Sequence, residues 1–351
     1  DAVPVRWPGS ADAPVDEPRG ASTFAEDTVI ALDAALIALR EEDRVPGRVV
    51  GVVENGEIAY VRAFGIGSSD TTAPLTIDDP FHTVSISKLF TTFLVMQLSE
   101  ERHLDLDGSV AEVVPEMTGS LVTPRQLLTH RSGDGAPWRY ADTNFDLLGE
   151  TVSRVEGEPF AEVARRRLFE PLGMRASGFA LDGGTDPDDL GVQGHADCTF
   201  GGLRTVEHPY DMASAPSSGL QASVDDLTRF MKAVLDRSQV LATAAAWDAM
   251  FTPVGATEWA GVEQGLGWQL ATIDGERVAR HAGSSAGFRT LLTVWPDRGR
   301  GIVILANAES AARWKIRSNR PARISFMPSS MSSAAEPSTD LVARIPSRRR
   351  V

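Results

Sequence analysis

The positions of the β-rich segments limit the possible folds of this chain more than any other sequence feature. Two runs rich in β-branched residues flank Asn55-Gly56 within residues 48–65, and a second β-rich region covers residues 278–306. Asn-Gly between two such runs favours a tight hairpin. The segments between the two regions are mostly helical in pattern. This order predicts an α+β fold in which both ends of the chain build one central antiparallel sheet, flanked by helices, and a mostly helical domain is inserted.

Apolar periodicity and capping residues locate the expected helices. Thr123-Pro124 is typical of an N-cap followed by proline at the first helical position, so a short helix should follow over 125–130. Helical spacing of apolar residues predicts longer helices over 23–42, 85–101, 144–156 and 224–235.

The length of 351 residues is more than one core usually holds. We expect a sheet domain from residues 23–84 and 215–310, with a helical domain over 85–214. Residues 1–22, rich in Pro, Ala, Gly and Asp, should form an extended lead-in. Residues 311–351 are basic, rich in Ser, Pro and Arg, and without sustained periodicity, so we expect a poorly ordered tail.

Charge and cysteine content limit the partners. The formal net charge of −14 disfavours nucleic acid and anionic membranes, and no apolar run is long enough for a membrane span. The single Cys198 cannot form an internal disulfide. The chain begins at Asp1, and a removed export signal is one explanation, which slightly favours a periplasmic or secreted protein over a cytoplasmic one. The oligomeric state is left open.

Two short motifs carry groups suited to nucleophilic chemistry. Ser85 and Lys88 stand three residues apart at the start of an apolar helix, so the lysine can reach the serine hydroxyl and assist it as a nucleophile. Tyr140-Ala141-Asp142 precedes another helix and offers a phenol that could move a proton. Taken singly, the first motif can arise by chance, and the second can be a core aromatic beside a helix-capping aspartate.

A third motif, His281-Ala282-Gly283-Ser284, would place a polar side chain and a close-approaching backbone beside a pocket. Its structural alternative is a tight connection at a strand end. Gly283 to Gly287 also matches the Gly-x-Ser-x-Gly nucleophile elbow, but no histidine follows Ser285, so that triad cannot be completed in its usual order. His-Glu-x-x-His and Cys-x-x-Cys motifs do not occur, and we expect neither a metal nor a cofactor.

The three motifs together resemble, in order and separation, those of the serine β-lactamase and penicillin-binding protein superfamily. The resemblance is strongest to class C β-lactamases, D-alanyl-D-alanine carboxypeptidases and β-lactamase-like esterases. It covers roughly residues 23–307, with further family-like stretches at 127–133, 142–149, 218–223 and 265–268. The resemblance implies a β-lactamase-like fold.

The resemblance also implies roles for individual residues. Ser85 would be the acylated nucleophile, Lys88 its activating partner and Tyr140 a proton shuttle. The backbone N–H groups of Ser85 and Ser284 would form the oxyanion hole. The implied reaction forms an acyl-enzyme that water then hydrolyses, without a metal.

Two departures from the family bear on the substrate. Asp142 stands where many members have Asn, and His281 begins the motif that is Lys-Thr-Gly in class C β-lactamases. An anion replaces a neutral group and a mostly neutral imidazole replaces a cation, so Asp142, His281 and Gly283 should form a substrate-binding region less suited to carboxylates.

We therefore expect a serine hydrolase acting on a small-molecule ester or amide, first of all a carboxylesterase on small acyl esters. The alternatives are a D-alanyl-D-alanine carboxypeptidase or D-aminopeptidase-like enzyme and a weak β-lactamase. A non-catalytic protein that binds cell-wall fragments is the alternative from another class. Family members usually continue from the last strand into a long helix; here Arg320-Pro321 interrupts that pattern, which predicts a partly uncovered sheet face.

Overall fold

A nine-stranded antiparallel sheet forms the centre of the protein, in the order β1-β3-β2-β14-β13-β12-β11-β10-β9. The computed structural model describes residues 18–69, 73–132, 137–179, 192–197, 203–206 and 212–313. The strands of the large sheet are β1 Arg19–Ser22, β2 Gly47–Glu54, β3 Glu57–Gly65, β9 Gly255–Ala256, β10 Val262–Gln264, β11 Gln269–Ile273, β12 Glu276–Ser285, β13 Phe288–Trp295 and β14 Arg300–Ala306.

Strands from the two ends of the chain meet in the middle of this sheet. β2 pairs with β14 from Arg48↔Ala306 to Val53↔Gly301, which confirms that both ends build one sheet. The hairpin between β2 and β3 turns at Asn55-Gly56, whose φ angles of 55° and 76° are those that asparagine and glycine adopt at least cost. Residues 19–22 of the expected lead-in form β1 at the edge of the sheet, and residues 1–17 lie outside the described ranges.

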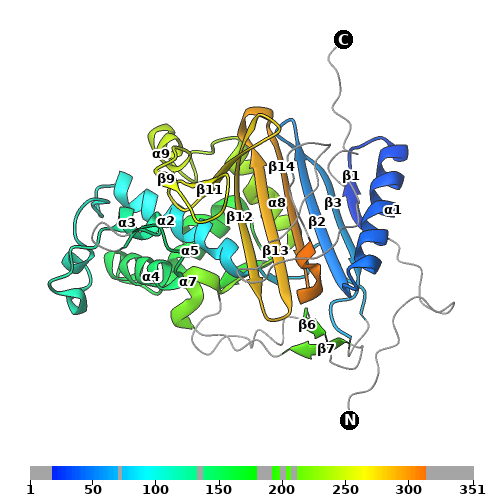
Figure 1. Ribbon diagram of the computed structural model, residues 1–351, viewed down its shortest axis with the longest axis horizontal. Coiled ribbons are helices and arrows are strands. Elements are labelled where there is room, and N and C mark those ends of the chain that lie inside the picture. The colour runs from blue at the N-terminus through cyan, green and yellow to red at the C-terminus, as the bar shows by residue number, and fades with distance from the viewer. Residues whose placement is uncertain are drawn as a thin grey trace.

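Each face of the sheet is covered by its own apolar cluster, because alternate residues of a strand point to opposite faces. On one face, α8 (Val224–Leu235) packs Leu227 and Phe230 into the cluster that contains Leu292. On the other face, α1 (Glu26–Glu42) packs Leu32 and Leu36 against a second cluster. Figure 1 shows α1 beside β1 and β3, with the helices of the middle of the chain gathered at the opposite end of the sheet.

The middle of the chain supplies most of the remaining helices, as expected. These are α2 Ser87–Glu100, α3 Pro124–Leu128, α4 Asp142–Glu156, α5 Phe160–Ala164, α6 Glu170–Leu172 and α7 Ala215–Ser218, with α9 Ala244–Met250 further on. Two small sheets accompany them, one of β4 (Phe81–His82), β8 (Leu220–Ala222) and β5 (Ser177–Phe179), and one of β6 (Gly194–Asp197) and β7 (Leu203–Val206). Among the described residues, no helix combines the length and apolar character needed to cross a membrane.

The sheet face on the α1 side is well covered in its middle, whereas Ala271 and Ala282 are only partly buried, so the expectation of a partly uncovered sheet face stays a prediction. Leu291, Ile302 and Ile304 point to the α1 side and are only 3%, 3% and 1% exposed. After β14 the chain forms a short 3-10 helix, η8 (Glu309–Arg313). The predictions for Cys198 and for residues 314–351 of the basic tail lie outside the described residues.

Candidate active site

The turn that carries Ser85 is strained and is fastened from two sides. Ser85 lies in the 3-10 turn η1 (Val84–Ile86), directly before α2. Val84 has a φ of 52°, a conformation that β-branched residues rarely adopt and that costs on the order of 1–3 kcal/mol. Ser87 Oγ donates a hydrogen bond to Val84 O (2.6 Å) and accepts one from Leu220 N (2.9 Å). These contacts hold the turn, and with it Ser85, in one conformation.

Lys88 lies one helical turn from Ser85 and is completely buried. Its Nζ has three acceptors, namely Asp142 Oδ1 at 2.6 Å, Ser217 O at 2.8 Å and Ser85 Oγ at 3.4 Å. An ammonium group offers three N–H donors, whereas a neutral amine offers two. The arrangement therefore matches the charged form of Lys88, and the Asp142 carboxylate offsets the cost of burying that charge.

The carbonyl of Ser217 is held in place by a second bond between the same two helices. Thr91 Oγ1, on the next turn of α2, donates to Pro216 O at 2.6 Å, so two consecutive carbonyls of α7 face α2. Sequence reasoning missed Ser217, because the group that contacts Lys88 is a backbone oxygen that every residue type carries.

Tyr140 lies over Lys88 among other rings. The Lys88 Nζ is 5.0 Å from the centre of the Tyr140 ring, and the ring of His130 lies 4.5 Å from it. His130 Nδ1 accepts a hydrogen bond from Ala141 N–H (3.2 Å), so the neutral imidazole carries its proton on Nε2. Burial, together with the nearby Lys88 cation, lowers the pKa of His130 to about 3. The sequence contained His130 only within the family-like stretch 127–133, without a local signal for this position.

His281 on β12 is the second neutral imidazole of the site. Burial, and next to it the charge of Lys88, holds the pKa of His281 well below its ordinary value. Its Nδ1 lies 3.0 Å from Ala282 O, and its ring is 6.4 Å from that of Tyr140. The expected neutral imidazole is thus present beside the candidate catalytic groups, and Asp142, at the first turn of α4, is 57% exposed at the side chain.

Strand β12 brings the third motif to the turn that carries Ser85. β11 pairs with β12 only as far as Gln269↔Arg280, so among the described strands residues 281–285 pair on the β13 side alone. This part of β12 lies against η1. A Cβ atom at Gly283 would lie 2.7 Å from Thr83 O and 2.8 Å from Val84 Cβ, which only a glycine avoids. Ser284 follows Gly283 on β12. Its backbone N–H therefore remains a candidate donor to the oxyanion hole.

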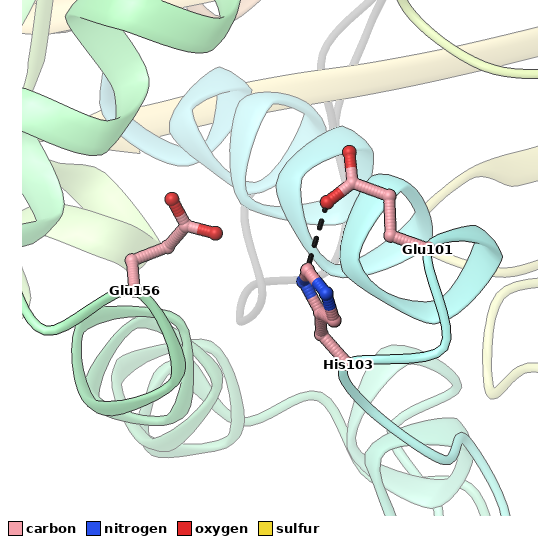
Figure 2. Close-up of side chains that lie close together, drawn as sticks. All are labelled: Glu101, His103 and Glu156. Atoms are coloured by element: carbon pink, nitrogen blue, oxygen red, sulfur yellow. Dashed lines mark ion pairs between the residues drawn. The ribbon is translucent and has the colours of Figure 1, made fainter.

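One group of side chains in the described ranges has the spacing of a cation site, and it lies far from Ser85. Figure 2 shows Glu101, His103 and Glu156 close together, with the Glu101–His103 pair marked. Glu101 follows the C-terminal end of α2, about 24 Å from Ser85 at the rise of a helix. Arg167 donates to both oxygens of Glu101 and to Glu156, and its hydrogen bonds lower the pKa of Glu101. Arg166 also pairs with Glu156, so two guanidinium groups already balance the two carboxylates, and we assign no metal to them.

The beta-lactamase family matches residues 32–320, and the chain belongs to this family. Members of the family are serine hydrolases, which supports an enzymatic role for this chain. The chain is 28% identical to Esterase EstB of Burkholderia gladioli, over 74% of this chain and 86% of the esterase. It is 27% identical to Penicillin-binding protein 4 of Amycolatopsis lactamdurans, over 77% of this chain and 83% of that protein. A D-aminopeptidase of Cereibacter sphaeroides is 24% identical, over 80% of this chain and 60% of its own length.

Solved structures confirm the expected fold. The octameric penicillin-binding protein homologue from Pyrococcus abyssi aligns with a TM-score of 0.74 at 24% identity, over 80% of this chain and 74% of that one. The D-alanine carboxypeptidase AmpC from Burkholderia cenocepacia aligns with a TM-score of 0.70 at 22% identity, over 81% of this chain and 95% of that one. At these identities the likeness establishes the β-lactamase-like fold and leaves the substrate open.

Proposed function

We propose that this protein is a carboxylesterase that hydrolyses small neutral esters through an acyl-enzyme on Ser85. The observation that carries the proposal is the distribution of charge around Ser85. Lys88 is already paired with the Asp142 carboxylate, and His130 and His281 are neutral because of their lowered pKa values. Within this group a substrate carboxylate would meet the half-exposed Asp142 carboxylate of a neutral pair, whose Lys88 cation is completely buried, and neutral rings. A neutral ester needs no cation there.

In this proposal the first proton of acylation moves along the contacts of Lys88 Nζ with Ser85 and Asp142, and Tyr140 serves the leaving group. Ser85 Oγ bonds to the ester carbonyl carbon as its proton passes to Lys88 Nζ, while a Lys88 proton passes to Asp142 at 2.6 Å. Tyr140 gives its hydroxyl proton to the departing alkoxide and regains one from the Lys88–Asp142 pair. The alcohol thus leaves with the proton that Ser85 lost. Water then attacks the acyl-enzyme, and the same groups move its proton in the reverse direction.

The negative charge that develops on the ester oxygen needs fixed donors. We assign this role to the backbone N–H groups of Ser85 and Ser284, since β12 lies against η1. Removal of one such donor typically lowers the rate on the order of a hundred- to a thousandfold.

A comparison of three substrates tests the proposal. We expect kcat/KM for a short-chain nitrophenyl ester to exceed that for a D-alanyl peptide and for a chromogenic cephalosporin by at least about tenfold. The Ser85→Ala variant should hydrolyse none of them above background. A preference for the peptide or the cephalosporin would overturn the esterase assignment.

A D-alanyl-D-alanine carboxypeptidase or D-aminopeptidase-like enzyme is the second candidate, because relatives at similar identity carry the names penicillin-binding protein and D-aminopeptidase. Turnover of the D-alanyl peptide alone would establish it. Binding of cell-wall fragments by a folded protein that turns over none of the three substrates would establish the non-catalytic alternative.

A further inference from the structure

The half-buried indole of Trp259 stands beside Tyr140 and takes no part in the proton transfers proposed above. Its ring centre lies 5.9 Å from that of Tyr140 and 4.9 Å from that of Trp138, edge to face. Trp138 is 7% exposed and donates its Nε1–H to Gln264 Oε1 at 3.1 Å. Trp138, Tyr140 and Trp259 thus form a continuous aromatic wall, with Trp138 fixed behind the more exposed Trp259.

The loop that carries Trp259 is held by its own hydrogen bonds. Thr257 Oγ1 accepts from Trp259 N (3.1 Å) and donates to Val262 O (2.9 Å), and Val262 N donates to Trp259 O at 3.1 Å. The hairpin of β9 and β10 is also fastened to the segment that precedes Tyr140, because Arg131 Nη2 donates to Ala256 O at 2.9 Å. A ring held in this way is pre-organised for binding and loses little conformational freedom when a ligand packs on it.

We propose that the aromatic wall is the subsite for the alcohol part of the substrate, and that esters of aromatic or bulky apolar alcohols are preferred. The inference rests on the proposed esterase function. There, Tyr140 protonates the departing alkoxide, so a ring that packs against Tyr140 lies on the alcohol side of the scissile bond. An aryl group against the face or edge of Trp259 gains a ring–ring contact in addition to the burial of its surface.

Benzyl acetate and ethyl acetate test the subsite, because they share an acyl group and differ in the ring of the alcohol. In Trp259→Ala we expect the ratio of kcat/KM for benzyl acetate to that for ethyl acetate to fall about tenfold. Trp259→Phe keeps a ring and should retain most of the ratio. The ratio of ethyl butyrate to ethyl acetate, which varies the acyl side, should not change. Leu121→Ala, which truncates an exposed apolar side chain outside the wall, is the matched control and should leave every ratio unchanged.

Equal losses for benzyl and ethyl acetate in Trp259→Ala, or a change in the butyrate ratio, would overturn the alcohol subsite and leave the esterase function intact. If the wild-type protein hydrolyses no ester, saturation-transfer NMR of benzyl alcohol separates the two proposals. Binding that disappears in Trp259→Ala would support the wall while rejecting the esterase, and absence of binding to the wild type would overturn the wall.

Discussion

Replacement of Asp142 by asparagine changes the charge of the site while keeping its shape. The amide oxygen can still accept from Lys88 Nζ, which lies 2.6 Å from Asp142 Oδ1. The Lys88–Asp142 pair goes from neutral to a charge of about +1, since His130 and His281 stay neutral near pH 7 at their lowered pKa values. A substrate carboxylate should therefore be repelled less in Asp142→Asn than in the wild type.

Coulomb's law gives the size of this effect. For a carboxylate about 6 Å away and an effective dielectric constant of about 40, set by the exposed side of Asp142, the change is about 1.4 kcal/mol, or about tenfold. The assay is the ratio of kcat/KM for an anionic cephalosporin to that for a neutral nitrophenyl ester. Effects on Ser85 activation that are common to both substrates cancel in this ratio.

The ratio should rise about tenfold in Asp142→Asn at low ionic strength, and the rise should shrink in high salt because mobile ions screen the charge. Asp107→Asn, which removes a carboxylate from an exposed pair with Arg125, is the control and should leave the ratio unchanged. An unchanged or reduced ratio in Asp142→Asn would refute the argument that charge selects neutral esters.

Two further predictions concern stability and the approach of β12 to Ser85. Because the pKa of His130 is about 3 in the folded state and about 6.5 in an unfolded chain, only the unfolded state takes up this proton as pH falls below about 6.5. Between pH 6.5 and pH 4.5 the wild type should lose about 2–3 kcal/mol more unfolding free energy than His130→Asn in denaturant titrations, and equal slopes would contradict this. Gly283→Ala should lower kcat at least about a hundredfold, because the new Cβ pushes β12 away from Thr83 and Val84. Gly178→Ala, where a Cβ would meet nothing within 4 Å, should stay near wild type, and similar kcat values for the two variants would contradict the close-approach argument.

Sequence patterns correctly predicted the turns and helices that are determined by residues close together in the chain. The Asn55-Gly56 turn lies where expected, and α8 buries the apolar side seen in its sequence. The short strands β9 and β10, of two and three residues, were not predicted, because so few residues cannot show a period of two. β10 is placed by its pairing with β11, and β9 is placed at the sheet edge by its pairing with β10.

Some groups of the candidate site could likewise be predicted from the sequence, and others could not. Ser85, Lys88 and Tyr140 were predicted as site residues because their motifs are visible in the sequence, and the structure brings the three side chains together. The Ser217 carbonyl is hidden from such reasoning, since it belongs to the backbone. The contact of Trp259 with Tyr140 joins residues more than a hundred positions apart, and only the folded chain brings them together.

The proposed reaction depends on Ser85 as the nucleophile and on Lys88 as the group that activates it. Reaction with a fluorophosphonate, followed by mass-spectrometric mapping of the modified peptide, identifies the nucleophile without depending on the choice of substrate. We expect label on Ser85, no label in Ser85→Ala and much less label in Lys88→Ala. Label on Ser285, or no label on a demonstrably folded protein, would contradict it.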